Sequence, residues 1–369
     1  MSTGLRVLQL YPKDDYYTGA AMQLRELACG LHGRGHQVVI ATRPSPDWES
    51  RCREAGLPHH ALPMTSEVDL RSVRLLARIL RKHRIQVVHA QKGKARTLAM
   101  IAGLFVRIPV LVLNRGVSFP LDAFNRMGYT TRRVTAIVAV CESIKQGLID
   151  RGVSADKIEV IYSGTDTDRF HPGVDGAGIR RELGLGPEHF LVTQVGVRSL
   201  KGNDDVLDAM SKIAPRLPYA RLLFVGANEA KAARLREKAA QRGISDVVSI
   251  FSLREDVPQI LAASDTTVDA SYAGLGLTGA LRESLAVGTP VVATDIEGNP
   301  ELVIHGETGC LVAPRDTAAL AEALVGLASD PERARRMGWA GRARVEAMFS
   351  TRVKVERTEA LYHRLLAHA

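Results

Sequence analysis

A glycine-rich stretch that leads into acidic and amide side chains holds the densest set of chemically useful residues. Residues 273–303 read AGLGLTGALRESLAVGTPVVATDIEGNPELV. The glycines let a ligand oxygen approach backbone N–H groups, and the start of the following helix adds partial positive charge. Glu283 on that helix can accept hydrogen bonds from a ribose diol. We predict a sugar or phosphate site here; the alternative is a helix start with turn glycines and no ligand.

A pair of cations follows a predicted strand in the middle of the chain. Residues 195–202 read VGVRSLKG and contain Arg198 and Lys201. A loop at the carboxyl end of a parallel strand is well placed for a diphosphate, because arginine can bind two phosphate oxygens and lysine supplies a compact charge. The alternative is that both are solvated loop charges.

A third glycine, Gly19, lies between the first predicted strand and the helix that follows it. Such a glycine can admit a phosphate or sugar to the helix N-terminus, or it can be an ordinary turn residue. The sequence lacks a complete GxGxxG pattern, which argues against a nicotinamide dinucleotide site.

Metal and redox chemistry have little support in the residue pattern. Asp166-Thr167-Asp168 has the DxD form, but it lies in a turn-rich segment where aspartate and threonine commonly cap turns and helix starts. The histidines show no zinc-protease spacing, and the four cysteines form no CxxC pair. We expect no metal and no cofactor.

The positive charge is concentrated in the N-terminal half. The chain of 369 residues has a formal net charge of +9, and residues 1–170 hold 25 basic and 15 acidic side chains. Such asymmetry suggests that this half meets an anionic partner. Lys92, Lys94 and Arg96 follow a strand end and are candidate ligands for an acidic or phosphorylated acceptor. No motif interleaves aromatic side chains with these cations, so nucleic acid is not the expected partner.

A basic helical segment at residues 71–84 has two interpretations. Val73, Leu76 and Leu80 form one apolar face, and basic residues occupy much of the remainder. This is typical of a helix packed on a sheet with a solvated basic face. The alternative is peripheral contact with an anionic membrane. The chain shows no signal peptide and no membrane-spanning stretch, so we expect a cytoplasmic protein, with the inner face of the membrane as a second position.

Short apolar runs alternate with helical patterns along the whole chain. Mostly apolar rather than alternating runs are typical of parallel strands buried on both faces. Strands are predicted at residues 5–11, 37–42, 87–90, 110–114, 136–141, 158–162, 191–197, 221–226, 247–251, 266–270, 291–294 and 310–312. The alternation predicts an α/β protein with doubly wound parallel sheets, and twelve strands favour two Rossmann-like domains over one.

The predicted boundary between the domains lies in a segment rich in Gly, Asp, Thr and Pro at residues 163–178. The expected division is residues 1–168 for the acceptor and residues 169–351 for the donor. The last helix, residues 352–369, is expected to return to the first domain.

The glycine-rich stretch resembles the donor-binding signature of the family-4 retaining glycosyltransferases, which have the GT-B fold of two Rossmann-like domains facing a cleft. The usual pattern there is Glu, seven residues, Glu, then a Gly-x-Pro-Val-Val-Ala-Thr strand and a Gly-Gly-x-x-Glu turn. Other matching segments are GLHGRGHQVVIAT at residues 30–42, VVHAQ at 87–91 and IYSGTDTDRFHP at 161–172. Residues 256–271 and 330–349 match as well, so the resemblance covers nearly the whole chain.

The resemblance implies roles for individual residues. Arg198 and Lys201 match the pair that binds the donor diphosphate, and Glu283 matches the glutamate that holds the nucleotide ribose. Residues expected to meet the donor largely through backbone groups are Leu253 and Arg254 at the nucleobase, and Gly276, Leu277, Thr278, Gly298 and Asn299 around the sugar and phosphates.

The chain departs from the family pattern at two places. Leu275 stands where the first glutamate of the pattern is expected, and a shifted register would place Ala273 there. Arg115 replaces a histidine that usually lies close to the donor sugar. It could bind an anionic acceptor, support the leaving phosphate or form a structural ion pair.

The prediction is a retaining glycosyltransferase that moves a sugar from a nucleotide-diphosphate donor to a glycan or lipid-linked acceptor, in bacterial-type polysaccharide, lipopolysaccharide or glycolipid synthesis. Arg198, Lys201 and Arg115 are the predicted catalytic residues. Three alternatives stay open: a nucleotide-sugar epimerase, a member that binds a nucleotide sugar or glycan without turnover, and a nucleic-acid binder.

Overall fold

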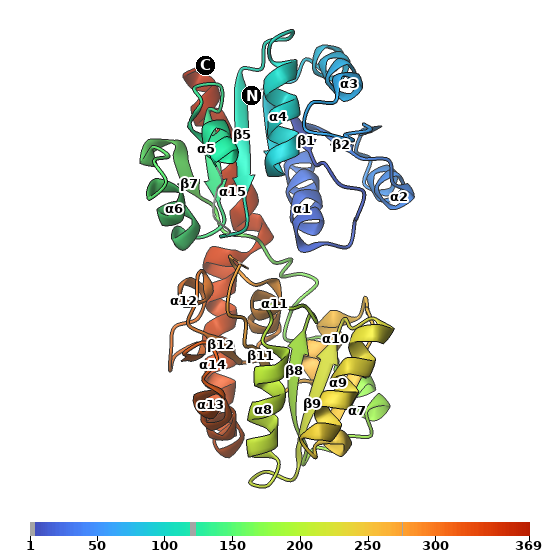
Figure 1. Cartoon of the computed structure of the whole chain (residues 1–369), viewed down its shortest axis with the longest axis vertical. Helices are drawn as coiled ribbons and strands as arrows, with labels where there is room; N and C mark the ends of the chain where they lie inside the picture. Colours follow the sequence, from blue (N-terminus) through green and yellow to red (C-terminus); the bar gives the residue numbers. More distant parts are fainter. Residues whose placement is uncertain (1–3, 119–122, 275) are drawn as a thin grey trace. The chain divides into compact units, whose positions relative to one another are not determined.

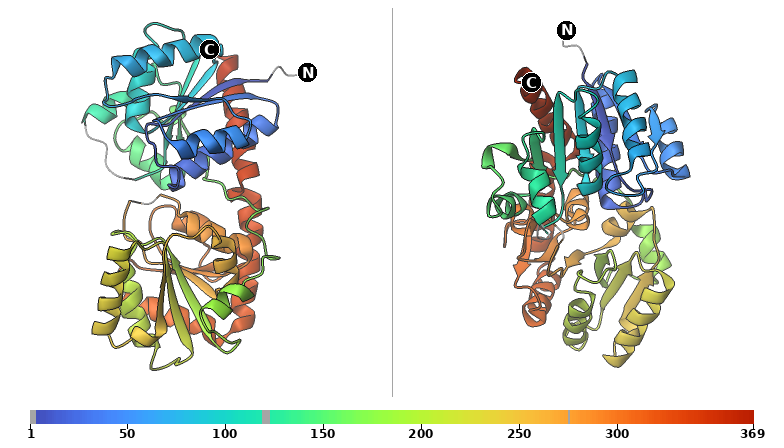
Figure 2. Two further views of the ribbon diagram at one scale, coloured as in Figure 1. Left: turned by 90° about the vertical axis from the view of Figure 1, so that its right-hand side faces the viewer. Right: turned by 45° about the horizontal axis from the view of Figure 1, so that its top comes forward.

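A computed structural model describes residues 4–118, 123–274 and 276–369. The described chain forms two compact units, Met1–Gly164 with Thr351–Ala369, and Thr165–Ser350. Each unit is built on one parallel sheet with helices on both faces (Figures 1 and 2). The two doubly wound sheets confirm the predicted fold class, because buried parallel strands need helices on both sides.

The first unit contains a seven-stranded parallel sheet with the strand order β3-β2-β1-β4-β5-β6-β7. Its strands are β1 (Arg6–Leu10), β2 (Gln37–Thr42), β3 (His59–Ala61), β4 (Val87–Gln91), β5 (Val110–Arg115), β6 (Ala136–Ala139) and β7 (Ile158–Val160). Its helices are α1 (Gly19–Gly33), α2 (Pro46–Glu54), α3 (Leu70–Lys82), α4 (Lys92–Ala102), α5 (Ala123–Thr130), α6 (Glu142–Ile149) and α15 (Thr351–Ala367).

The second unit contains a six-stranded parallel sheet with the strand order β10-β9-β8-β11-β12-β13. Its strands are β8 (Phe190–Val195), β9 (Ala220–Val225), β10 (Val248–Phe251), β11 (Thr266–Asp269), β12 (Val291–Thr294) and β13 (Gly309–Val312). Its helices are α7 (Ala177–Glu182), α8 (Asn203–Ile213), α9 (Glu229–Gln241), α10 (Val257–Ala263), α11 (Gly279–Val287), α12 (Asn299–Leu302), α13 (Thr317–Ser329) and α14 (Pro331–Arg344), followed by a π-helical turn at Val345–Phe349.

The apolar runs of the sequence form the cores of both sheets. Val7, Leu8 and Leu10 on β1 are fully buried, as are Val291 and Val292 on β12. Twelve of the strands correspond to predicted runs, whereas β3 was not predicted. Its three residues, His59, His60 and Ala61, pair only with β2 at the sheet edge, and this pairing leaves no apolar pattern in the sequence.

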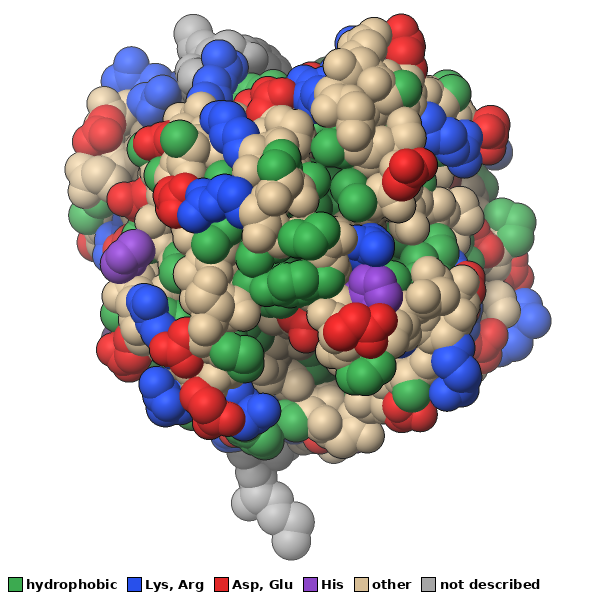
Figure 3. Space-filling view, turned by 90° about the horizontal axis from the view of Figure 1, so that it is seen from below, with side chains coloured by type: hydrophobic (Ala, Val, Ile, Leu, Met, Phe, Trp, Pro, Cys, Tyr) green, Lys and Arg blue, Asp and Glu red, His purple; other side chains and the backbone are tan. Residues whose placement is uncertain are grey.

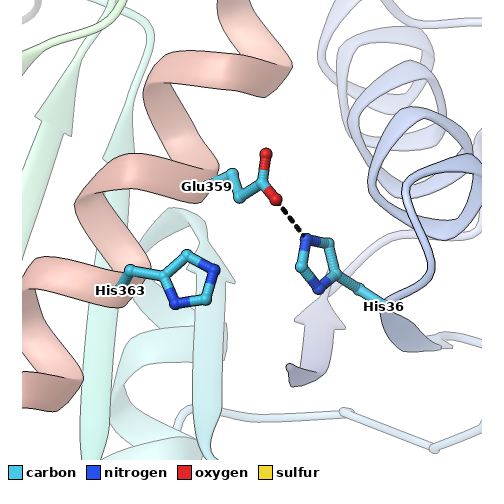
Figure 4. Close-up of side chains that lie close together, drawn as sticks. All are labelled: His36, Glu359 and His363. Atoms are coloured by element: carbon cyan, nitrogen blue, oxygen red, sulfur yellow. Dashed lines mark hydrogen bonds and ion pairs between the residues drawn. The ribbon is translucent and has the colours of Figure 1, made fainter. Parts of the chain in front are cut away.

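The last helix, α15, packs in the first unit beside α1 (Figures 1 and 2). Glu359 on this helix accepts a hydrogen bond from His36 Nε2 at 2.8 Å (Figure 4). It accepts a second from Arg34 Nε at 2.6 Å. Tyr362 lies in the core, where its hydroxyl contacts His89 Nδ1 of β4 at 2.6 Å. These contacts explain why a segment more than 180 residues downstream in sequence belongs to the first unit.

The chain passes between the units at Gly164–Thr165 and at Ser350–Thr351. Thr165 and Ser350 form a β-bridge, and Gln23 exchanges two hydrogen bonds with the backbone of Gly164, at 2.7 and 2.8 Å. The two crossings are therefore paired with each other. The first crossing lies near the start of the predicted boundary segment, residues 163–178, and four residues before the predicted division at residue 168. The second crossing lies one residue before the predicted end of the second domain at residue 351.

Acidic, basic and apolar side chains are interspersed on the face shown in Figure 3. Among the described residues, none of the helices combines the length and the apolar character needed to cross a membrane.

Candidate functional site

The strand order of the second sheet reverses between β8 and β11, which are hydrogen-bonded neighbours. In an open parallel sheet, ligands bind outside the carboxyl ends of the strands at such a switch point. The loop after β8 carries Arg198 and Lys201, and the loop after β11 is the glycine-rich stretch. Topology alone therefore places the two predicted donor segments at the same edge of one sheet.

Arg198 and Lys201 have different environments although they share a loop. Arg198 is exposed, whereas Lys201 is 2% exposed and its ammonium group forms an ion pair with Asp269 at the end of β11, which is 1% exposed. Gly202, which follows, has φ of 61°, and a Cβ there would collide with the carbonyl oxygen of Ala270. This close approach of the two loops buries Lys201.

Further hydrogen bonds join the loops after β8 and β11. The Tyr272 hydroxyl donates to the carbonyl of Ser199 at 2.7 Å, and the Tyr272 N–H donates to the carbonyl of Leu200 at 3.1 Å. Asp269 also accepts hydrogen bonds from the N–H and the hydroxyl of Ser271. The Asp269 carboxylate therefore binds groups from both loops, Lys201 after β8 and Ser271 after β11.

The glycine-rich loop is held by Glu297, a residue for which the sequence predicted no role. Glu297, in the turn after β12, accepts the backbone N–H of Gly274 and that of Gly276, each at 2.6 Å. The Gly298 N–H donates to the Gly276 carbonyl at 3.1 Å. Leu275, the departure from the family pattern, lies outside the described residues. The amides of Gly274 and Gly276 are thus already hydrogen-bonded within the chain.

The start of helix α11 offers further N–H groups. Its N-cap is Thr278, whose side chain makes no capping hydrogen bond within the described part of the chain, and both Leu277 and Thr278 are buried. The first N–H groups of a helix have no partner within the helix, and with the helix dipole they attract anions. This helix start is the part of the loop best suited to a phosphate.

Glu283 lies on α11, one turn beyond that start, and is partly buried. Burial raises the pKa of the Glu283 carboxyl above its ordinary value. The positive charges of Arg282, Arg169 and Lys201 act in the opposite direction, so these cations lie near the carboxyl. Glu283 and Lys201, predicted independently to bind the donor, are thus neighbours in the second unit.

Asn299, at the start of α12, is 1% exposed. Its Nδ2 donates to the carbonyl of Thr294 at 3.0 Å, but its Oδ1 has no hydrogen-bond partner among the described residues. An unsatisfied buried carbonyl is costly, and a ligand hydroxyl or a water is the usual remedy. Gly298, beside it, is also buried.

The predicted base-reading segment presents one apolar and one charged side chain. Leu253 is 70% exposed. Arg254 is bound to the carboxylates of Glu182 at 2.8 Å and Asp256 at 2.6 Å, and its guanidinium lies 4.7 Å from the centre of the Phe251 ring. The Arg254 side chain is therefore held within the unit by these contacts. If a nucleobase binds at this segment, we expect the backbone, and not the Arg254 side chain, to contact it.

In the first unit, Gly19 and Arg115 lie at the carboxyl ends of strands on both sides of the β1–β4 switch point. Gly19 is exposed, and a Cβ placed there would meet no atom of the described residues within 4 Å. Arg115, the last residue of β5, lies 5.9 Å from the centre of the Tyr129 ring.

The three predicted acceptor ligands differ in their surroundings. Lys92, the first residue of α4, is exposed, and its ammonium lies 6.0 Å from the Tyr11 ring centre. Partial loss of hydration around the Lys92 ammonium and the nearby positive charge of Lys13 lower the pKa of Lys92. Lys94 donates to the Met64 carbonyl at 3.1 Å. The Arg96 side chain is 2% exposed and lies against Gly128 and Tyr129, away from solvent.

Two groups could be mistaken for metal centres. Asp166 accepts the N–H groups of Asp168 and Arg169 at 3.0 and 3.1 Å, which makes the DxD sequence a turn cap. The ligand atoms of His36, Glu359 and His363 lie within 4.8 Å of one another (Figure 4). However, His36 Nδ1 accepts the Leu5 N–H at 3.0 Å, so in neutral His36 the Nε2 atom carries the proton that Glu359 accepts. That proton occupies the position that a metal ion would need.

The structure therefore brings Arg198, Lys201, Glu283 and the α11 start to one edge of the second sheet. Glu297 was missed because its significance depends on contacts with residues more than 20 positions earlier. One signal was available: in the Gly-Gly-x-x-Glu turn of the family pattern, Glu297 occupies the position of the first glycine.

Two family models match the chain. The model described as Glycosyltransferase Family 4 matches residues 17–169, and the model described as Glycosyl transferases group 1 matches residues 189–330. A D-inositol 3-phosphate glycosyltransferase of Nocardia farcinica is 37% identical over 197 residues, or 51% of this chain and 43% of that protein. The lipopolysaccharide core biosynthesis mannosyltransferase LpsB of Rhizobium meliloti is 32% identical over 215 residues, or 56% of this chain and 61% of that protein.

The matched regions span about half the length of these curated relatives. A solved structure, HepE of Anabaena in complex with UDP, has a TM-score of 0.85 with this chain at 21% identity, covering 97% of this chain and 99% of that chain. This likeness shows the shared GT-B fold. One model matches the N-terminal part of the chain and the other matches the C-terminal part. The chain therefore belongs to the family-4, group 1 glycosyltransferases.

Proposed function

We propose that this protein transfers a sugar from a nucleotide-diphosphate donor to a glycan or lipid-linked acceptor, with retention at the anomeric carbon and in the cytoplasm. The observation that supports this proposal is that three features suited to donor binding lie at the same edge of the second sheet, at the β8–β11 switch point. These features are the exposed Arg198, the uncapped start of α11 and Glu283. Together they suit a ligand with two phosphates and a ribose diol.

The second unit supplies the proposed donor chemistry. Arg198 and the N–H groups at the α11 start would stabilise the diphosphate as it leaves with the bonding electrons of the anomeric carbon. Glu283 would accept the ribose hydroxyls. The acceptor oxygen would form the new bond, and its proton would pass to the leaving phosphate. No step needs a metal ion or a cofactor.

The family and one relative support the proposed pathway. HepE was solved with UDP, and LpsB acts in lipopolysaccharide core biosynthesis. By analogy we propose a nucleotide-sugar donor and a role in polysaccharide, lipopolysaccharide or glycolipid synthesis. Retention rests on resemblance to the family.

We propose that the first unit binds an anionic acceptor and contacts an anionic membrane. Lys92 is exposed at the β1–β4 switch point and is the best-placed cation for the acceptor. In the segment that follows α4, Leu104 and Phe105 are 60% and 64% exposed. Arg81 donates to the Phe105 carbonyl at 3.0 Å, and Arg107 and Arg133 are also exposed. Exposed apolar tips among arginines suit the interface of an anionic bilayer.

One observation favours a second function, donor binding without turnover. The Lys201 charge is already paired with Asp269, so it is less available to a leaving phosphate than the sequence suggested. Incubation with donors and lipid-linked or glycan acceptors, followed by NMR of the product, separates the possibilities. A new α-linked product from an α-linked donor supports the proposed reaction. An altered free donor would indicate an epimerase, and an unchanged bound donor would indicate a binding protein.

A further inference from the structure

Glu297 has a backbone conformation that glutamate rarely adopts. Its φ is 49°, in the left-handed region, where a Cβ is unfavourable and glycine is the usual residue. Residues in this region persist where surrounding contacts hold them, and they concentrate at functional sites. Glu297 is held in this conformation by contacts with the glycine-rich loop.

The left-handed turn directs the Glu297 carboxylate at the glycine-rich loop. One carboxylate oxygen accepts the N–H of Gly274 and the other accepts the N–H of Gly276, both at 2.6 Å. Hydrogen bonds to an ionised acceptor are among the stronger ones in proteins. The Gly298 N–H adds a third bond to the Gly276 carbonyl, at 3.1 Å.

The two residues that donate these bonds are glycines, which are costly to order. Gly274 and Gly276 have φ of 77° and 59°, and glycine loses more conformational entropy on ordering than any other residue. The loop runs directly into α11, whose uncapped start and Glu283 form the proposed donor site. Whatever orders the loop therefore also orders the entry to this helix.

We propose that Glu297 is a positioning residue that fixes the glycine-rich loop in its donor-binding form before the donor arrives. This inference rests on the proposed donor site. A preordered loop lowers the entropy lost on binding and strengthens binding of ground state and transition state alike. The opposite arrangement is a carboxylate that occupies amides needed by the donor and must leave when the donor binds. The two arrangements predict opposite changes in donor affinity.

The variant Glu297→Gly separates these roles, because glycine keeps the left-handed turn while it removes the carboxylate. Arg84→Gly is the matched control: Arg84 has the same φ of 49°, is exposed, and lies in the other unit. Both variants replace a charged residue in the same conformation. Glu297→Gln is a second variant that retains one acceptor oxygen of the two.

The first measurement is amide hydrogen exchange of Gly274 and Gly276 by NMR, without any ligand. Loss of a hydrogen bond to a charged acceptor is expected to speed exchange about tenfold or more in Glu297→Gly, with Glu297→Gln intermediate. Arg84→Gly is expected to exchange at the wild-type rate at both amides. Unchanged exchange in Glu297→Gly would overturn the proposed hold on the loop.

The second measurement is the kinetics of transfer with varied donor concentration. A positioning role predicts that Glu297→Gly raises KM for the donor about tenfold, with kcat within about twofold of wild type. Unchanged or lowered KM overturns the inference, and a lowered value would identify Glu297 as a competitor of the donor. If the wild-type protein binds no nucleotide sugar, the proposed function fails while the exchange result still decides whether Glu297 orders the loop.

Discussion

Arg198 and Lys201 are both cations of the same loop, but only Arg198 is exposed to solvent in the structure. Arg198 is exposed, whereas Lys201 is buried in an ion pair with Asp269, 68 positions later. The sequence identifies both cations by type and spacing. It cannot show the pairing, because that depends on the approach of two loops from neighbouring strands.

This difference predicts opposite outcomes for two alanine variants. Lys201→Ala leaves the buried Asp269 carboxylate without its cation and is expected to lower the free energy of unfolding by about 3–5 kcal/mol. Arg198→Ala is expected to change it by less than about 0.5 kcal/mol, because the side chain is exposed. Urea unfolding of both variants tests this contrast. Equal stability losses would contradict the assigned environments.

Glu283 is expected to reduce stability while it supports binding. Its folded pKa is raised, so the folded state binds more protons than the unfolded state as pH rises above about 4.5, and its contribution to stability falls over that window. Glu283→Gln removes this cost and should unfold at an equal or higher urea concentration at pH 8. Donor affinity should fall about tenfold or more, since a charged acceptor is lost. Reduced stability with unchanged affinity would indicate a structural residue.

At the scale of elements, strand periodicity predicted the architecture well because buried parallel strands are almost continuously apolar. The loops after β8 and β11 were correctly assigned to strand ends, which was enough to locate a candidate site. The glutamate that holds the glycine-rich loop was not predicted, because side-chain hydrogen bonds to distant backbone leave no periodicity. The same limit applies to the contacts of α15 with the first sheet.

Tyr362 anchors α15 in the first unit. Gln9 Nε2 donates to the Tyr362 hydroxyl at 3.4 Å, so the hydroxyl proton is directed to His89 Nδ1 at 2.6 Å. Tyr362→Phe leaves a buried acceptor unsatisfied on His89 and is expected to cost about 1–3 kcal/mol of unfolding free energy. Urea unfolding at pH 8 is the measurement, with Tyr219→Phe on the second unit as the control. An unchanged midpoint for Tyr362→Phe would contradict this arrangement.

His89 gives the first unit a specific pH dependence. Burial, with a smaller effect of Lys354, lowers the pKa of His89 to about 3. Between about pH 3 and 6.5 the unfolded state binds the additional proton, so stability due to this group falls as the pH is lowered, by about 1.4 kcal/mol per pH unit. His89→Gln should flatten the slope of unfolding free energy between pH 5 and 6.5. An identical slope would show that His89 is not buried in the neutral form.

At the scale of the whole molecule, the excess of basic over acidic side chains lies in the N-terminal half of the sequence. In that half, Leu104 and Phe105 are exposed beside several arginines. The protein is expected to co-sediment with vesicles containing phosphatidylglycerol more than with pure phosphatidylcholine, and to be released by salt, since each nearby cation contributes about 1 kcal/mol. Replacing both Leu104 and Phe105 by serine should weaken binding about tenfold or more. Trp339→Ser is the control, because Trp339 is 55% exposed on α14. Equal sedimentation with both vesicle types would contradict the membrane proposal.

The central claim is that the β8–β11 switch point of the second sheet binds a nucleotide-diphosphate sugar. The most direct test is calorimetric titration of the full-length protein with UDP-, GDP- and ADP-sugars, with Arg198→Ala and the control Arg234→Ala, which removes an exposed arginine of α9. We predict that at least one donor binds wild type and Arg234→Ala equally, and Arg198→Ala about ten to a hundredfold more weakly. Binding of no donor, or equal binding by all three proteins, would contradict the claim.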